Sequence, residues 1–300
     1  MDSMQPISYK IEFFSRLPIY NRGLLHVFTL ILDEIPIMPF LINILTLWIM
    51  MSGAWIIRLI SGKSGWIDAV WSLSIALTGL IASWTPFDWN NLTRRQIIVG
   101  LCVFIAYLRL GIHISYRTYY SGDDPRYLTL EKNWGKNFKI KLYAFLQIQA
   151  LCALVLSLAV YLAARNPEPI NSIKDFFALL VIFIAICGEA LADKQLRDFK
   201  KISISKKLCD SGLWSLSRHP NYFFEWLNWV GIALLAININ GTWPHGLFAL
   251  LAPLMMYWLL RYVSGVPHVE NHLLTTRPTE FREYQKNVNV FFPGFRKKTS

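Results

Sequence analysis

Charge is scarce in this 300-residue chain. Asp, Glu, Lys and Arg together supply 16% of its residues, whereas 54% are hydrophobic and the mean hydropathy is +0.36. An average soluble domain has about 25% charged residues. The composition therefore excludes an ordinary soluble domain and indicates an integral membrane protein.

Cysteine pairs, repeats and linkers are also lacking. The four cysteines, Cys102, Cys152, Cys187 and Cys209, form no CxxC or secreted disulfide pattern, so we expect small buried side chains. No repeat of fixed period divides the chain, and residues 1–34 lack the pattern of a removable signal peptide. We expect an N-terminal segment, 1–34, outside a single membrane domain, 35–300.

Long apolar runs are what the sequence has in abundance. They lie near 35–57, 66–86, 97–116, 143–163, 176–192, 222–237 and 245–261. Each is close to the roughly 20 residues that a helix needs to cross the hydrocarbon of a bilayer. The predicted fold class is an all-α integral membrane protein, a bundle of about seven transmembrane helices.

Basic residues favour one face of this bundle. The segments 58–65, 117–142, 193–221 and 261–300 hold 22 Lys and Arg, whereas 1–34, 86–96, 164–175 and 238–244 hold 7. This asymmetry predicts an external N-terminus and a cytoplasmic C-terminus. The net charge of +11 is then explained by topology and by contact with the lipid bilayer, so we expect no nucleic-acid partner.

Two connecting segments face the basic side. Residues 117–142 form a polar loop that begins with turn chemistry at Gly122, Asp123, Asp124 and Pro125. The stretch after 193 is typical of a helix that continues out of the membrane and ends before a turn at Gly212.

A charged residue inside a span marks a candidate site, because an unpaired charge costs several kcal/mol there. Span two contains Asp68, span three has Arg109, His113 and Arg117 every four residues, and a second series follows at the end of span five. An ion pair of the Asp68–Arg109 type could lock two helices, or the same groups could face a ligand. The second series comprises Glu189, Asp193, Arg197 and Lys200 or Lys201.

The stretch SRHPNYFFEW concentrates polarity at the start of span six. Pro220 suits the first turn of a helix, and Asn221 and Glu225 then share one face. Arg218 and His219 would lie at the rim, where helix N–H groups and cations suit phosphates. After span seven, His268 and His272 are four residues apart, but no second histidine box accompanies them, so we expect no catalytic metal.

Several motifs in a fixed order resemble the steroid 5-alpha-reductase-like superfamily, within its bacterial branch. They are GWIDAVWSL, LRLGIHISYR with GDDPRY, EALADKQLRDFKK, SGLWSLSRHPNYFFEW, and VENHLL before FREYQKNVNVFFPGF, and they cover roughly residues 60–295. The resemblance implies a seven-helix membrane enzyme that uses NADPH to reduce a carbon-carbon double bond conjugated to a carbonyl. The substrate would be a steroid, an isoprenoid or another lipophilic small molecule.

The resemblance also implies roles for particular residues. The substrate side, 35–163, offers groups that could polarise a carbonyl or take part in the chemistry, and the C-terminal part, 164–300, offers the cofactor contacts. The substrate-side candidates are Asp68, Tyr107, Arg109, His113 and Tyr116. The cofactor-side candidates are Asp193, Arg197, Lys200, Arg218, His219, Asn221, Tyr222, Glu225, His268 and His272.

Two other classes are weighed against a reductase. Methyltransferases that use S-adenosylmethionine, of the isoprenylcysteine carboxyl or phospholipid type, also carry an Arg-His-Pro-Asn-Tyr segment, but the Glu189 series and Glu225 favour a reductase. A transporter would show repeat symmetry around a midplane site. The expected location is a multi-pass position in the bacterial inner membrane, or in the endoplasmic reticulum of a eukaryote.

Overall fold

The computed structural model describes residues 37–85, 91–120, 124–202 and 208–296. These residues contain no β-strand, and their only β-bridge joins Ser217 to Asn289. The α-helices are α2 (Ile37–Ser61), α3 (Gly65–Trp84), α4 (Arg94–Tyr120), α5 (Pro125–Trp134), α6 (Phe138–Arg165), α7 (Ile173–Ile202), α8 (Pro220–Ala236), α9 (Leu251–Trp258), α10 (Val266–Thr276) and α11 (Pro278–Asn287). Shorter helical turns are η4 (Gly135–Asn137), η5 (Gly212–Ser215), η6 (Pro244–Leu250) and the π-helix η7 (Leu259–Val263).

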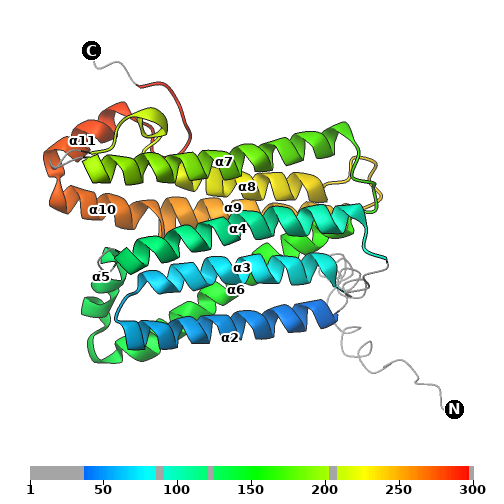
Figure 1. Ribbon diagram of the computed structural model, residues 1–300, viewed down its shortest axis with the longest axis horizontal. Helices are drawn as coiled ribbons and strands as arrows, with labels where there is room; N and C mark the ends of the chain where they lie inside the picture. Colours follow the sequence, from blue (N-terminus) through cyan, green and yellow to red (C-terminus); the bar gives the residue numbers. More distant parts are fainter. Residues whose placement is uncertain (1–36, 86–90, 121–123, 203–207, 297–300) are drawn as a thin grey trace, which may run out of the picture.

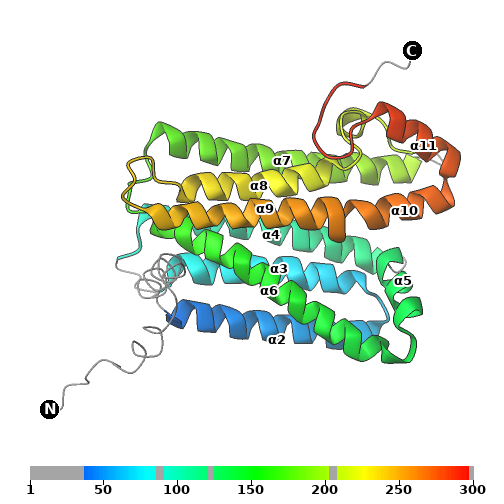
Figure 2. The ribbon, with the colours of Figure 1, turned by 180° about the vertical axis from the view of Figure 1, so that it is seen from behind.

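The long helices run side by side along the longest axis of the molecule (Figures 1 and 2). We call the end that carries α5, α10 and α11 the basic end. The end of α3, the start of α4 and the connections from α6 to α7 and from α8 to η6 lie at the opposite end. The described chain therefore begins at the opposite end, with α2, and finishes at the basic end, with α11.

Six helical segments are long and apolar enough to cross a membrane. They are Phe40–Ser61, Gly65–Trp84, Arg94–Tyr120, Arg126–Arg165, Ile173–Lys201 and Pro244–Thr276. Every predicted span overlaps a helical segment, but α8 has only 17 residues and is not among these six. The predicted segment 1–34 lies outside the described residues.

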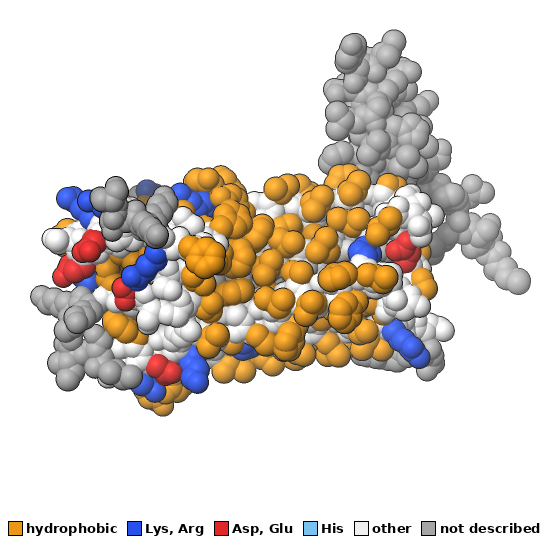
Figure 3. Space-filling view, turned by 90° about the horizontal axis from the view of Figure 1, so that it is seen from above, with side chains coloured by type: hydrophobic (Ala, Val, Ile, Leu, Met, Phe, Trp, Pro, Cys, Tyr) orange, Lys and Arg blue, Asp and Glu red, His pale blue; other side chains and the backbone are white. Residues whose placement is uncertain are grey.

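The surface fits a bilayer. In Figure 3 hydrophobic side chains form a broad middle band, and charged side chains gather toward the two ends. Exposed Leu, Ile, Phe and Trp side chains on α2, α4 and α7 supply much of this apolar surface. Together with the six long apolar helices, this makes the protein a multi-pass membrane protein. The cysteine prediction was wrong in part, because only Cys209 is buried and Cys187 is exposed.

Small residues allow the helices to approach closely. A Cβ at Gly188 of α7 would lie 2.4 Å from the ring of Phe224 in α8, and one at Gly231 of α8 would lie 2.4 Å from Ile182. Such contacts hold membrane helices together, because lipid provides no hydrophobic driving force between them. They fix the register of α7 against α8, which sets the positions of the polar residues on both.

The segment 117–142 is largely helical rather than a loop. Helix α4 continues to Tyr120, and α5 begins at Pro125 after the cap residue Asp124, whose side chain accepts a hydrogen bond from the N–H of Arg126. Proline has no N–H to lose in a first turn, so this Asp-Pro pair starts a helix efficiently. The other prediction holds: α7 continues to Ile202, and Gly212 has a φ of 60°.

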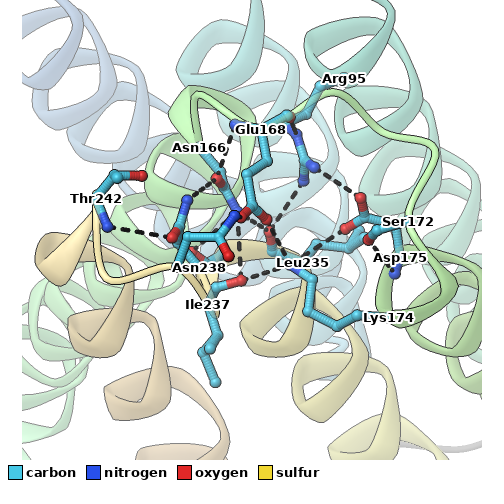
Figure 4. A network of polar contacts seen from close by, with 12 residues as sticks. Arg95, Asn166, Glu168, Ser172, Lys174, Asp175, Leu235, Ile237, Asn238 and Thr242 are labelled. Atoms are coloured by element: carbon cyan, nitrogen blue, oxygen red, sulfur yellow. Dashed lines mark hydrogen bonds and ion pairs between the residues drawn. The ribbon is translucent and has the colours of Figure 1, made fainter.

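At the opposite end a polar network closes the C-terminus of α8 (Figure 4). Arg95 of α4 donates to the carbonyls of Leu235 and Glu168 and pairs with Asp175 at 2.8 Å. The Asn166 amide also donates to the Leu235 carbonyl, at 3.1 Å. A helix end leaves its last carbonyls without partners, and here cationic and amide side chains satisfy them. Capping of the α8 C-terminus therefore explains this network.

Candidate functional site

A ladder of charged groups joins α4 to α7 inside the basic half of the bundle. Arg109 Nη1 lies 3.2 Å from Asp193 Oδ2, and Arg109 Nη2 lies 2.6 Å from Glu189 Oε2. The ring of His113 follows one turn later, with Nε2 3.8 Å from Asp193. The predicted helical faces thus meet, and one arginine serves two carboxylates.

Beside this ladder lie three polar residues of α8 that form no hydrogen bond or ion pair with it: Asn221, Tyr222 and Glu225. Proline at the first position starts α8 as predicted, and the helix places Asn221 and Glu225 one turn apart. The Asn221 Oδ1 atom is buried without a hydrogen-bond partner. No hydrogen bond or ion pair joins Glu225 to any described residue, although Glu189, Arg109 and Asp193 all act on it electrostatically.

A second cluster connects α3 to the start of α5. Arg126 donates to Asp68 and to Asp124, the latter at 2.8 Å, and the Tyr127 hydroxyl donates to Asp68 at 3.1 Å. Burial alone would raise the pKa of Asp124, but the hydrogen bonds and charge of Arg126 hold it below its usual value. Asp68 therefore pairs with Arg126, and the suggested pair with Arg109 does not form.

A third cluster, which we call the clasp, ties the start of α8 to the C-terminal helices. Glu270 of α10 accepts from Arg218 Nε at 2.8 Å, lies 3.1 Å from His219 Nε2, and accepts from Gln285 of α11 at 2.8 Å. Arg218 also donates to the carbonyl of Val288, at 2.7 Å. Burial lowers the pKa of His219, and the hydrogen bond to Glu270 offsets only part of that effect.

The remaining predicted residues divide between interior and surface. Tyr107 is buried, and its hydroxyl accepts a hydrogen bond from Trp229 of α8. Tyr116 is 57% exposed, and its ring packs against that of Tyr120 at an angle of 50°. His268 faces the second cluster, whose Arg126 and Asp124 act on it electrostatically. The surface positions are those of Arg197, Lys200 and His272; Arg197 is paired with Asp198 at 4.0 Å.

Sequence reasoning missed three polar residues that the fold brings to these clusters. Arg126 and Tyr127 lie in the GDDPRY motif, and Glu270 stands between the two histidines of HVENHLL. The signal that could have identified these three residues is their position next to apolar spans. Sequence reasoning also missed Asn228, which lies one turn after Glu225 on α8. Its side chain is 3% exposed, and neither its amide oxygen nor its amide nitrogen has a hydrogen-bond partner.

The arrangement combines unused hydrogen-bonding groups in the first turns of α8 with cations near the basic end. The free groups are those of Asn221, Tyr222 and Glu225, and the exposed Arg117 lies one turn beyond His113. Such a site can hold a ligand that is anionic at one end and offers donors at the other. Among the described residues no group of three His, Cys, Asp or Glu side chains is placed to hold a metal ion.

Comparison with known proteins places the chain in a family. Residues 54–288 match the model of a family described as protein of unknown function (DUF1295). An uncharacterized protein of Schizosaccharomyces pombe is 22% identical over 281 residues, which cover 85% of this chain and 80% of that protein. No solved structure matches the chain. The matched region runs from α2 to α11, so this chain belongs to the DUF1295 family of membrane proteins.

Proposed function

We propose that the protein is a membrane-embedded reductase that uses NADPH to reduce a carbon-carbon double bond conjugated to a carbonyl in a lipophilic substrate. The observation that carries the proposal is Asn221 Oδ1 in the first turn of α8, which is buried without a hydrogen-bond partner and lies one turn before Glu225. Unpartnered buried polar atoms are costly unless a ligand satisfies them. The ordered motifs of the steroid 5-alpha-reductase-like superfamily support this choice.

The residues present fit such a cofactor. Asn221 and Glu225 would hold the carboxamide end, and the exposed cations Arg117, Arg197 and Lys200 would meet phosphates toward the basic end. NADPH supplies a hydride when bound. Arg218 and His219 would not contact the phosphates, because both side chains are already paired with Glu270. They position the first turn of α8 instead.

The proposal includes a topology. The bundle would cross the membrane seven times, with the short α8 as the sixth span, the N-terminus outside and the basic end in the cytoplasm. The distribution of Lys and Arg supports this orientation. The α2–α6 half would shape the lipid-facing substrate side and the α7–α11 half the cofactor side, in a bacterial inner membrane or the endoplasmic reticulum.

One observation favours a second candidate, a methyltransferase that uses S-adenosylmethionine. Around Glu225 the carboxylates Glu189 and Asp193 outnumber the single Arg109. A sulfonium or ammonium group would be attracted to this excess of carboxylates. NADPH ranks first because cations at the basic end, among them the exposed Arg117 and Lys200, suit its three phosphates, which S-adenosylmethionine lacks.

Calorimetry of the full chain in mild detergent tests the two candidates. We expect NADPH to bind and S-adenosylmethionine not to bind measurably. The variant Asn221→Leu should weaken NADPH binding by about 10-fold, because it removes a good hydrogen bond to the ligand. As a matched control, Asn240→Leu at the opposite end should leave it unchanged. Tight binding of S-adenosylmethionine without binding of NADPH would establish the methyltransferase.

A further inference from the structure

We propose that Asn228 binds a hydroxyl group of a lipophilic ligand in the interior of the bundle. The inference deepens the proposed function, and it rests on that function only where it takes this ligand to be the substrate. The amide of Asn228 offers one oxygen that accepts hydrogen bonds and one NH2 group that donates them. The described chain uses neither of them.

Burial makes the unused amide of Asn228 unusual. Its side chain is 3% exposed, and neither Oδ1 nor Nδ2 has a hydrogen-bond partner, so the result holds whichever way the amide is turned. Nearly all buried polar groups in proteins are hydrogen-bonded. Asn43 of α2, which is 1% exposed, follows this rule through its Nδ2 atom, which donates to Ser157 of α6. The idle amide of Asn228 therefore requires an explanation outside the chain.

Helix α8 places Asn228 on the face between α7 and α4. Phe224 and Gly231, four residues before and three residues after it, both pack against α7. Trp229, the next residue, donates a hydrogen bond to Tyr107 of α4. With 3.6 residues per turn, Asn228 lies between these two directions and faces the interior of the bundle.

A second idle amide lies on the same face. Asn221, Glu225 and Asn228 follow the spacing of four and three residues that defines one face of a helix. The Asn221 Oδ1 atom is also buried without a partner. At 1.5 Å per residue the two amides are about 10 Å apart along the helix axis. One unpartnered atom can be a local packing defect, whereas two idle amides in line indicate a ligand that runs along α8.

The neighbouring part of α7 offers nothing to the Asn228 amide. The contacts of Phe224 with Gly188 and of Gly231 with Ile182 bring residues 182–188 of α7 to this depth. None of these seven side chains contains an oxygen or a nitrogen atom. An apolar wall with a single placed polar group is typical of a site for a lipophilic ligand.

The amide selects the polar group of that ligand. A hydroxyl donates and accepts, so it can use both Oδ1 and Nδ2 of Asn228, whereas a keto or ether oxygen only accepts and leaves Oδ1 idle. A carboxylate would bring a charge into the span, which is costly without a cation. The substrate class is therefore a lipid alcohol that also carries the conjugated carbonyl of the proposed function.

Thermal unfolding of the full chain in detergent, without ligand, tests whether the amide is idle. Asn228→Leu is close in volume and removes a polar group that has no partner, so the Tm should be unchanged or higher. Asn43→Leu is the matched control and should lower the Tm, because it leaves the buried Ser157 without its partner. A Tm of Asn228→Leu below that of wild type would reveal a partner inside the protein and overturn the proposal.

Three probes with one carbon skeleton test the hydroxyl: geranylgeraniol, its methyl ether, and the hydrocarbon in which hydrogen replaces the hydroxyl. The flexible chain lets the oxygen reach Asn228 from either direction. By calorimetry we expect wild type to bind the alcohol about 10-fold more tightly than the other two, the effect of one good hydrogen bond. Asn228→Leu should bind all three alike. A wild type without preference for the alcohol, or a preference that survives in Asn228→Leu, overturns the proposal.

Calorimetry with NADPH separates this proposal from the proposed function. Asn228→Leu should bind NADPH as wild type does, because its amide is assigned to the lipid. Loss of NADPH binding in Asn228→Leu would assign the amide to the cofactor instead and overturn the proposal. A wild type that prefers the alcohol through Asn228 but binds no NADPH would refute the reductase alone.

Discussion

Arg218 and Glu225 lie seven residues apart in one stretch but have different surroundings. The guanidinium of Arg218 is used by Glu270 and by two backbone carbonyls, so it works as part of the clasp. Glu225 has no partner among the described residues and lies beside the ladder. The first half of the motif therefore holds α8 in place, and the second half carries polar groups that the described chain itself does not use.

The buried His219 predicts a pH-dependent stability. Its folded pKa lies below the ordinary value of 6.5, so the unfolded chain takes up a proton first as the pH falls. The contribution of the neutral His219 to the free energy of unfolding is complete above about pH 6.5, and it is lost as the pH falls toward the folded pKa. Between about pH 7 and 5 the Tm of wild type should fall more than that of His219→Gln. The exposed His272→Gln should keep the wild-type slope, and equal slopes in all three proteins would contradict this account.

Helix α5 is held at the basic end mainly by Arg126. The Arg126→Met variant removes the cation that pairs with Asp68 and Asp124, and because these side chains are only partly buried the loss should be at most about 3 kcal/mol, the lower end for a broken buried ion pair. We expect a lower Tm and faster hydrogen exchange over Pro125–Trp134, read by mass spectrometry. Lys132→Met, on the exposed face of α5, serves as the control. If hydrogen exchange over Pro125–Trp134 in Arg126→Met stayed at the wild-type rate, other contacts would anchor the helix.

The end of α8 depends on the network of Figure 4. Arg95→Met removes the closer of the two cations paired with the buried Asp175 and leaves Lys174 at 3.3 Å, so the stability loss should reach about 3 kcal/mol, the lower end for a broken buried ion pair. Arg95→Met combined with Asp175→Leu also removes the carboxylate that has lost this partner and should recover part of the loss. Thermal unfolding in detergent measures both, with the exposed Arg94→Met as the control. A double variant less stable than Arg95→Met would mean that Asp175 has another role.

For the molecule as a whole the proposed orientation can be tested by labelling. In a chain whose native cysteines are replaced, Asn240→Cys lies at the opposite end and Lys132→Cys at the basic end, and both positions are exposed. A membrane-impermeant maleimide added to intact cells should label Asn240→Cys, while Lys132→Cys should react only after the cells are opened. The reverse result would invert the topology, and labelling of both in intact cells would contradict a bundle that spans the membrane.

The fold was predictable from local properties. Apolar runs of about 20 residues can bury their backbone groups in lipid only as helices, so hydropathy alone located the spans. Turn and capping chemistry is equally local, which is why Pro220 and Gly212 were interpreted correctly. The same chemistry at Asp124 and Pro125 was taken for a loop, because a start signal for a helix and a turn use the same residues.

The amino-acid sequence by itself determined the helical class, the membrane setting, the basic end and which charged residues share a helical face. Only the tertiary structure decided which of these charges meet: Arg109 reaches Asp193, 84 residues away, and Asp68 reaches Arg126. Helical periodicity specifies the face of one helix, whereas an ion pair depends on which helices are neighbours and at what depth. Close packing of α7 against α8 through Gly188 and Gly231 likewise sets the depth of Glu225 relative to the ladder, where it forms no ion pair.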